Sequence, residues 1–219
     1  MDKTIVNTIN LYVFYETSPA AVYGIGTYIR ELTATLNDCN INVCVIYLRS
    51  NKPDMEMEES EGIRYWYIPA SISVRNFRNN EERIERYYRN VLYLLQLYIV
   101  KKENLVFHLN HIHCKPLVDS LKSVFECKIV FVVHYLDSCI ALLGNICRLR
   151  RIISQPDENM NSEERIVKIH FQREKELFQS VDKIICLANH TFDLLHQVYQ
   201  IDKEKMVVIS NGLSDVAVV

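Results

Sequence analysis

A run of seven residues, His108-Leu109-Asn110-His111-Ile112-His113-Cys114, concentrates three imidazoles, an amide and a thiol. Imidazole and thiolate groups can hold a metal ion, and imidazole and amide groups can hydrogen-bond a polar substrate. In an extended strand His108 and Asn110 face one way and His111 faces the other, and the spacing matches no common zinc arrangement. We therefore favour a polar wall that contacts substrate hydroxyls. A metal-dependent enzyme that uses His108, His111, His113 and Cys114 stays open as an alternative.

A fourth histidine, His134, follows the apolar run that ends at Val133, with Asp137 three residues later. A histidine at the tip of a central strand can bind a substrate oxygen or a phosphate, and a nearby acid can orient it. The plainer alternative is a histidine satisfied by the protein itself, with Asp137 as the N-cap of the next helix. Position in the sequence does not decide between the two.

A glycine-rich segment, Gly24-Ile25-Gly26, precedes an amphipathic stretch that reaches Asn37. Glycines allow a tight turn, and the N–H groups at the start of a helix attract anions, so a diphosphate suits this place. A plain turn is the alternative. The third glycine of the dinucleotide fingerprint is missing, and no acidic residue clearly ends the second expected strand. This departure argues against a nicotinamide dehydrogenase.

The elements that would position these residues alternate between apolar β-rich runs and helical patterns, which indicates a Rossmann-like parallel sheet with helices on both faces. The expected strands are Ile5–Phe14, Ile41–Leu48, Ile63–Ile68, Leu105–Leu109, Lys128–Val133, Ile184–Leu187 and Met206–Ile209. The expected helices are Gly24–Asn37, Glu81–Lys102, one from Pro116, Cys139–Ile153, Ser162–Ser180 and Thr191–Tyr199. Ligands bind at the carboxyl ends of strands in such sheets. We therefore expect Gly24, Gly26, His108 and His134 to converge on one open groove.

Composition narrows the class of protein. The chain has 219 residues, 49% of them hydrophobic, with 25 basic and 27 acidic side chains. The balance gives no reason to expect nucleic acid as a partner. The seven cysteines form no paired framework and no signal peptide is visible, so a reducing, cytoplasmic compartment is expected.

Two further stretches have alternative interpretations. The acidic segment Asn51–Gly62 is expected to be a solvated loop. The aromatic run Tyr65-Trp66-Tyr67 alternates on a strand ahead of an arginine-rich segment, and sheet packing is its favoured explanation. Stacking on a sugar or docking on a membrane surface is the alternative.

Taken together, these features resemble the N-terminal domain of family 4 glycosyltransferases, which have the GT-B fold. Gly24-Ile25-Gly26-Thr27-Tyr28 is similar to the "GIG-R/T-Y" segment of that family beside the donor phosphates, and His108 and His111 lie where the family often carries histidines. Val133-His134 with Asp137 resembles its "H-D" element, although two residues separate the histidine from the acid here.

The resemblance extends to the end of the chain. Arg173-Glu174 followed by Val181–Ala188 is similar to the "R-x-E…AD-x-I-I-x-V-S" segment. Val207–Leu213 is similar to "V-I-P-N-G-V", the crossover to the second domain, with Ser210 in place of the proline.

The family implies a role for each matching residue. Gly24, Ile25 and Gly26 would bind the donor phosphates, and His134 would act in catalysis by hydrogen bonding to sugar. His108, Asn110, His111 and Asp137 would bind the acceptor. No metal or other cofactor is expected, because the departing phosphate of a retaining transfer is thought to assist the reaction itself.

The family also implies how the chain is organised. Residues 1–213 would form the acceptor-side domain and 214–219 the start of the interdomain linker, with the C-terminal donor-binding domain absent. The expected activity is a hexosyltransferase that moves a sugar from a nucleotide sugar to a glycan or lipid-linked acceptor with retention, in polysaccharide biosynthesis. The chain alone would be inactive, and contact with the inner face of the membrane stays open. The alternative function is a stand-alone Rossmann-like module that binds a phosphate ligand or a protein without catalysis.

Overall fold

The computed structural model describes residues 8–16, 24–37, 39–70 and 80–212. Eight strands in these ranges form one sheet in the order β3-β4-β2-β1-β5-β6-β7-β8. The strands are β1 (Ile9–Glu16), β2 (Ile41–Ser50), β3 (Glu56–Ser60), β4 (Ile63–Pro69), β5 (Leu105–Leu109), β6 (Cys127–Val133), β7 (Lys183–Cys186) and β8 (Met206–Val208). The α-helices are α1 (Ile25–Asn37), α2 (Asn80–Tyr98), α3 (Lys115–Val124), α4 (Asp137–Ile140), α5 (Ile146–Ser154), α6 (Ser162–Ser180) and α7 (Asn189–Gln197), with short 3₁₀ turns η2 (Asp157–Asn159) and η3 (Lys203–Lys205).

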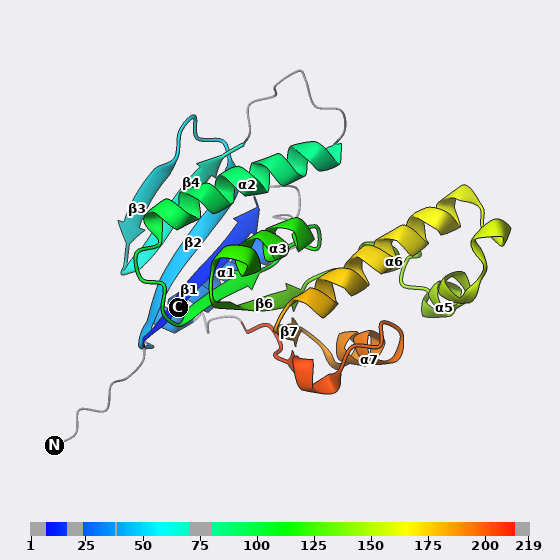
Figure 1. The fold of residues 1–219 in the computed structure, drawn as a ribbon. Coiled ribbons are helices and arrows are strands. Elements are labelled where there is room, and N and C mark those ends of the chain that lie inside the picture. Colours follow the sequence, from blue (N-terminus) through cyan, green and yellow to red (C-terminus); the bar gives the residue numbers. More distant parts are fainter. Residues whose placement is uncertain (1–7, 17–23, 38, 71–79, 213–219) are drawn as a thin grey trace, which may run out of the picture.

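Every pairing in the sheet is parallel except the one between β3 and β4. The order reverses on either side of β1, as in doubly wound α/β folds. The predicted Rossmann-like sheet with helices on both faces is confirmed. Its parallel strands bring the carboxyl ends of β1, β5 and β6 to the same end of the sheet (Figure 1).

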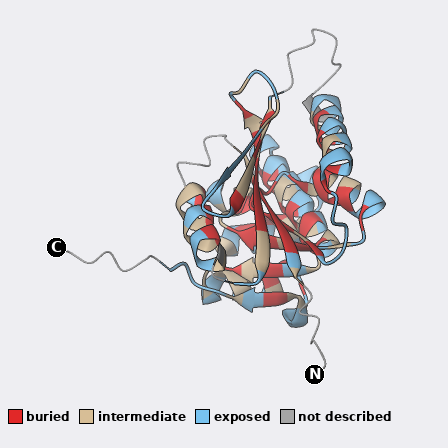
Figure 2. Cartoon of the chain, turned by 90° about the vertical axis from the view of Figure 1, so that its left-hand side faces the viewer, coloured by how far each residue is buried: buried red, intermediate tan, exposed pale blue. Residues whose placement is uncertain are grey.

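The two faces of the sheet are covered unequally. A large apolar cluster joins one face to α2, α3, α6 and α7. A small one joins the opposite face to α1. Figure 2 shows the buried strands standing between these two helical layers. We call the first the covered face and the second the open face. Alternation of side chains along each strand separates them, so Ile184 is fully buried on the covered face whereas its neighbour Ile185 is half-buried.

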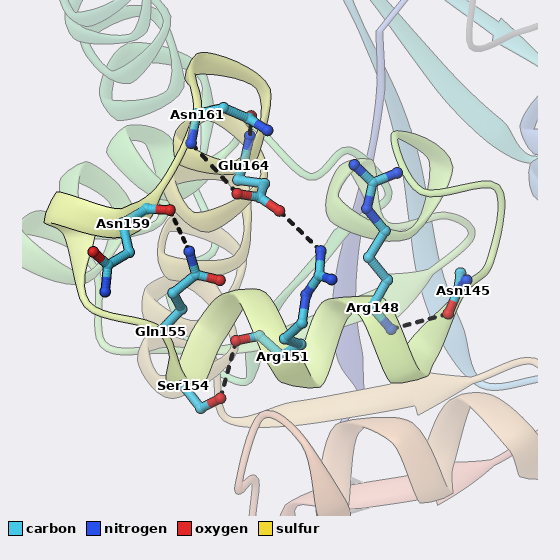
Figure 3. Close-up of polar contacts among 8 residues, drawn as sticks. All are labelled: Asn145, Arg148, Arg151, Ser154, Gln155, Asn159, Asn161 and Glu164. Carbon is cyan, nitrogen blue, oxygen red and sulfur yellow. Dashed lines mark hydrogen bonds and ion pairs between the residues drawn. The ribbon is translucent and has the colours of Figure 1, made fainter.

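Helices α4, α5 and the first half of α6 form a projection beyond the end of the sheet (Figure 1). Local capping explains its shape. Asn161 and Glu164 form a reciprocal capping box at the start of α6, and Asn145 caps α5 by accepting the N–H of Arg148. The Glu164 carboxylate also binds Arg151 of α5 at 3.0 Å, which ties the two helices together (Figure 3).

Three predicted elements differ from the structure. Glu56–Ser60 is a strand rather than a loop, although its residues are mostly exposed as expected. The predicted helix Cys139–Ile153 is two helices, because Leu143 and Gly144 have φ angles of 50° and 77° and end the first one. Helix α2 ends at Tyr98 rather than Lys102, and residues 5–7 of the first predicted strand lie outside the described residues.

Candidate functional site

Four side chains from three elements meet at the carboxyl ends of β5 and β6. The hydroxyl of Tyr28 on α1 lies 3.2 Å from Nε2 of His108, and the two rings stack with centroids 5.9 Å apart. Asn110 lies between the histidines, with its Nδ2 3.2 Å from His108 Nδ1 and its Oδ1 3.0 Å from His134 Nε2. The Tyr28 ring also meets the His134 ring edge-on at 5.0 Å. We call these four residues the histidine cluster.

The hydrogen bonds of Asn110 fix where the protons lie in the histidine cluster. Its amide nitrogen donates to the backbone carbonyl of Phe14 at 3.1 Å and to His108 Nδ1. His108 therefore carries its proton on Nε2 and donates it to the Tyr28 hydroxyl. The amide oxygen of Asn110 accepts from His134, so the proton of His134 is on Nε2 and its Nδ1 has a lone pair. Among the described residues, that Nδ1 has no hydrogen-bond partner.

Both histidines of the cluster are neutral at physiological pH. Burial lowers the pKa of His108 to about 3, and repulsion from His134 adds to the effect. Burial lowers the pKa of His134 to about 4, with a smaller contribution from His111. Burial also raises the pKa of Tyr28 to about 12. His134, the half-buried histidine of the two, can accept a hydrogen bond from a hydroxyl group without carrying a charge.

His111 lies outside the histidine cluster, at the end of β1. Its Nε2 accepts the backbone N–H of Glu16 at 2.8 Å, and burial lowers its pKa. It thereby holds the end of β1. The Glu16 carboxylate in turn pairs with Arg49 at 2.5 Å. Arg49 has a φ angle of 54° at an irregularity in β2, and its guanidinium lies over the Tyr87 ring.

Asp137 does not cap a helix with its side chain, because it is the first residue of α4 and its carboxylate points elsewhere. Its Oδ2 lies 3.1 Å from Nε2 of His113 and 3.7 Å from Nδ1 of His170. The hydrogen bond with His113 lowers the pKa of Asp137 and raises that of His113. Asp137 therefore forms a small charged group beside the histidine cluster rather than part of it.

Next to Asp137, a buried network fixes the first turn of α4. The Glu174 carboxylate accepts hydrogen bonds from the Ser138 backbone N–H at 3.1 Å, the Ser138 hydroxyl at 2.6 Å and the Tyr199 hydroxyl at 2.6 Å. Burial raises the pKa of Glu174, against the lowering effect of these hydrogen bonds. The network links α6 and the end of α7 to the chain just after His134.

The two glycines at the start of α1 have different surroundings. Gly24 has a φ angle of 78°, which side-chain-bearing residues rarely adopt, and its carbonyl accepts the N–H of Tyr28 at 3.0 Å. A Cβ on Gly26 would lie 3.2 Å from the Tyr15 hydroxyl. The Ile25 side chain is fully buried, so only its backbone could meet an anion.

Among the described residues, the positions expected to share one groove do not line a single cavity. Gly26 lines a cavity of about 510 Å³, His108 a second of about 530 Å³ and His134 a third of about 580 Å³. His108 and His134 nevertheless meet in the histidine cluster, where Tyr28 makes contact with both rings. One groove shared by all four positions stays a prediction. The cavity beside His134 is mostly apolar and includes Ile140 and Leu143, whose side chains are 52% and 97% exposed.

Most of the predicted acceptor-binding residues are buried and bond within the protein. His108, Asn110 and His111 are buried with exposed fractions of 4%, 1% and 6%, and each makes hydrogen bonds within the protein. In the structure they support His134 and the end of β1. Direct contact between these residues and an acceptor stays a prediction.

Within the described ranges, no three or more histidine, cysteine, aspartate or glutamate side chains gather in a way that suits a metal ion. The alternative metal set does not assemble here, because His108 and His111 bond to Asn110 and Glu16 and burial raises the pKa of the Cys114 thiol.

None of the described helices is both long and apolar enough to span a bilayer.

Sequence reasoning missed two features of the site. Tyr28 stands in the segment that resembles the glycine motif of the family, but the sequence gives no hint that it contacts His108 and His134. Glu174 stands in a segment that the family resemblance covers, but nothing in the sequence pairs it with Ser138, 36 positions away.

The sequence model of Glycosyltransferase Family 4 matches residues 22–215 of the chain. No curated protein sequence matches it. Similar solved structures include sucrose-phosphate synthase from Thermosynechococcus elongatus, with a TM-score of 0.61 and 15% identity over 94% of this chain and 48% of that one. The catalytic domain of Starch Synthase IV from Arabidopsis thaliana, bound to ADP and acarbose, has a TM-score of 0.57 and 14% identity over 94% and 52%.

A glycosyltransferase from Rickettsia africae ESF-5 has a TM-score of 0.53 and 13% identity over 94% of this chain and 44% of its own. The chain thus spans about half the length of these three proteins. At these identities the likeness shows the fold.

Proposed function

The chain belongs to glycosyltransferase family 4, and from that premise we propose that it forms the acceptor-side half of an enzyme that transfers a sugar from a nucleotide sugar to a hydroxyl-bearing acceptor. The family match covers both the glycine segment and the strand tips that carry the histidine cluster. Starch Synthase IV, which has a similar fold, was solved with ADP and acarbose. The proposed donor is therefore a nucleotide sugar, and the proposed acceptor is a glycan or a lipid-linked sugar.

The observation that carries this proposal is the state of His134. Asn110 holds its Nε2–H, burial keeps the ring neutral, and Nδ1 is left without a partner among the described residues. A neutral imidazole of this kind can accept a hydrogen bond from a sugar hydroxyl and orient it for transfer. The lowered pKa of His134 means that this ability persists down to mildly acidic pH.

The glycine segment has a separate proposed task. The first N–H groups of α1 have no partner within the helix, and the positive end of its dipole favours a diphosphate. Gly24, with a φ angle of 78°, forms the left-handed turn directly before these groups. They would stabilise the negative charge that develops on the departing nucleoside diphosphate. A second half of the enzyme would supply the base and ribose contacts.

Several finer points of the proposal come from the family alone. The transfer would retain the anomeric configuration, use no metal and take place at the cytoplasmic side of a membrane where surface polysaccharides are made.

The proposal can be tested with the protein in its full natural length. We would incubate it with UDP-, GDP-, ADP- and TDP-sugars and measure the nucleoside diphosphate that is released. At least one donor should be consumed, and His134→Ala should slow its consumption by about 100-fold or more, in line with other groups that position or exchange a proton.

His196→Ala serves as the matched control, because His196 lies on α7 with its Nδ1 bonded to the carbonyl of Ile201. It should leave the rate within about twofold of wild type. If the protein binds sugar nucleotides but consumes none of them, the stand-alone binding module is the better account. Equal rates for wild type and His134→Ala would remove His134 from the mechanism.

A further inference from the structure

Four tyrosines form a continuous aromatic surface on the open face of the sheet. In the strand register, Tyr15 of β1 is opposite Tyr47 of β2, and Tyr47 is opposite Tyr67 of β4. Tyr65 is two residues before Tyr67 on the same side of β4. The rings of Tyr47 and Tyr67 stack at 4.9 Å, Tyr15 meets Tyr47 edge-on at 5.2 Å, and Tyr65 lies 6.4 Å from Tyr47. We call these four residues the tyrosine row.

A cavity of about 510 Å³ lies between the tyrosine row and α1. Tyr15, Tyr47 and Tyr65 line one side of it, and Arg30 and Thr33 of α1 line the other. This volume is within the range of roughly 300–1,000 Å³ that is usual for small-molecule sites. Arg30 is the charged residue of this lining, and it is exposed.

Three hydroxyl groups of the row differ from those of other tyrosines in the sheet region, whereas the hydroxyl of Tyr67 bonds Glu58. On the covered face, the Tyr87 hydroxyl accepts the N–H of Arg49 and the Tyr199 hydroxyl donates to Glu174. In the described part of the chain, no hydrogen bond engages the hydroxyls of Tyr15, Tyr47 or Tyr65, and all three side chains are half-buried. Burial raises the pKa of Tyr47 to about 12, so its hydroxyl keeps its proton as a donor.

We propose that this cavity binds a sugar residue of a glycan, with the tyrosine rings against the C–H faces of the sugar and the free hydroxyls bonded to its hydroxyl groups. Tyrosine suits this task because it offers an apolar ring and a polar tip on a stiff side chain. An aliphatic chain in the same place would leave these hydroxyls without partners, which is unfavourable.

The cavity also has a defined relation to the proposed donor loop. Gly26 lines it, and the Tyr15 hydroxyl lies where a Cβ of Gly26 would nearly touch it. A sugar on the tyrosine row would therefore lie beside the first turn of α1. The identification of this sugar with the acceptor rests on the proposed function, whereas its binding does not.

The test is a binding measurement that needs no sugar nucleotide. The protein in its full natural length would be applied to an array of oligosaccharides, and the affinity of the strongest ligand measured by saturation-transfer NMR. Tyr65→Ala should weaken that affinity at least 10-fold. Tyr65→Phe, which keeps the ring and loses the hydroxyl, should weaken it by about two- to fivefold.

Tyr93→Ala is the matched control, because Tyr93 is 62% exposed on α2, over the covered face. It should leave the affinity unchanged. Trp66, the sole tryptophan of the chain, is buried on the opposite side of β4. Its fluorescence verifies that each variant folds.

Three results would overturn the inference. The first is a folded wild-type protein that binds no oligosaccharide, or that binds equally well after Tyr65→Ala. The second is a variant that loses affinity for UDP, GDP or ADP and not for glycans, which would make the row a base-stacking site. The third is a dimer in solution that Tyr65→Ala converts to a monomer, which would make it a contact between two copies. If glycans bind as expected and no sugar nucleotide is consumed, only the transfer function fails.

Discussion

The covered and open faces of the sheet are built from alternate residues of the same strands, yet they carry different kinds of side chain. The covered face holds fully buried residues such as Phe107, Phe131 and Ile184 beneath several helices. The open face has a smaller buried set that includes Val13 and Val45, together with half-buried tyrosines and one histidine of the cluster, beneath helix α1. The covered face supplies most of the stability, which allows the open face to keep cavities. Stability and ligand binding should therefore respond to different substitutions.

The neighbours Ile184 and Ile185 test this comparison with the largest expected effect. They have the same side chain and stand one residue apart on β7, but Ile184 has 0% exposure on the covered face whereas Ile185 lines a cavity on the open face. Ile184→Ala should lower the free energy of unfolding by about 2–5 kcal/mol, as is usual for a buried isoleucine. Ile185→Ala should cost about 1 kcal/mol or less. Urea denaturation followed by Trp66 fluorescence measures both, and equal losses would refute the unequal cover.

The buried network of Ser138, Glu174 and Tyr199 shows that the covered side also contains polar structure with consequences at the strand tips. Tyr199→Phe removes a hydroxyl that bonds Glu174 and Ser138, and should lower the free energy of unfolding by about 1–3 kcal/mol. It should also loosen the first turn of α4, just after His134. Amide hydrogen exchange at residues 137–140 measures that second effect. Unchanged exchange there would limit the network to a role in stability.

The sequence predicts the covered face of the sheet better than the open face. The alternation of apolar residues predicts the strands and the covered core, because burial imposes its period directly on the sequence. Strand β3 (Glu56–Ser60) could not be predicted in this way. It is an edge strand with one neighbour, so most of its side chains are exposed and show no apolar alternation.

The site is less predictable because its contacts are between residues far apart in the chain. The sequence locates His108, Asn110 and His134 at strand tips, as the parallel topology requires. It does not show that Tyr28 contacts both histidines, since that depends on the position of α1 over the sheet.

Two glycines with the same backbone conformation allow a second comparison, between the proposed donor loop and a turn away from it. Gly24 before α1 and Gly62 in the turn before β4 have φ angles of 78° and 77°. Alanine at either position should cost about 1–2 kcal/mol of stability, since the left-handed conformation is unfavourable with a Cβ. Only Gly24→Ala should also weaken sugar-nucleotide binding, because Gly62 is at the amino end of β4. Thermal unfolding and calorimetric titration of both variants provide the measurement, and a matching loss of binding in Gly62→Ala would contradict the proposed donor loop.

The smallest expected effect concerns pH. Burial lowers the pKa of His108 to about 3 and of His134 to about 4 in the folded state, against about 6.5 when the chain is unfolded. Above pH 6.5 both states are neutral at these groups. As the pH falls below 6.5, the unfolded chain binds protons that the folded cluster excludes, so the free energy of unfolding should fall by of the order of 1 kcal/mol per pH unit.

His113 acts in the opposite sense, because Asp137 raises its pKa in the folded state and its stabilising contribution is lost as the pH rises through that value. His113→Ala should therefore remove the loss of stability that wild type shows as the pH rises from 6.5 through the folded-state pKa of His113. Urea denaturation at several pH values measures the slope for both proteins. A free energy of unfolding that rises in wild type as the pH falls from 6.5 to 5 would contradict the neutral cluster.

The most direct test of the central claim is a crystal structure of the protein in its full natural length with the sugar nucleotide that it consumes and an acceptor oligosaccharide. The account predicts an acceptor hydroxyl within hydrogen-bond distance of His134 Nδ1, and a diphosphate at the backbone N–H groups that follow Gly24. A complex in which both ligands bind away from the carboxyl ends of β1, β5 and β6 would contradict it.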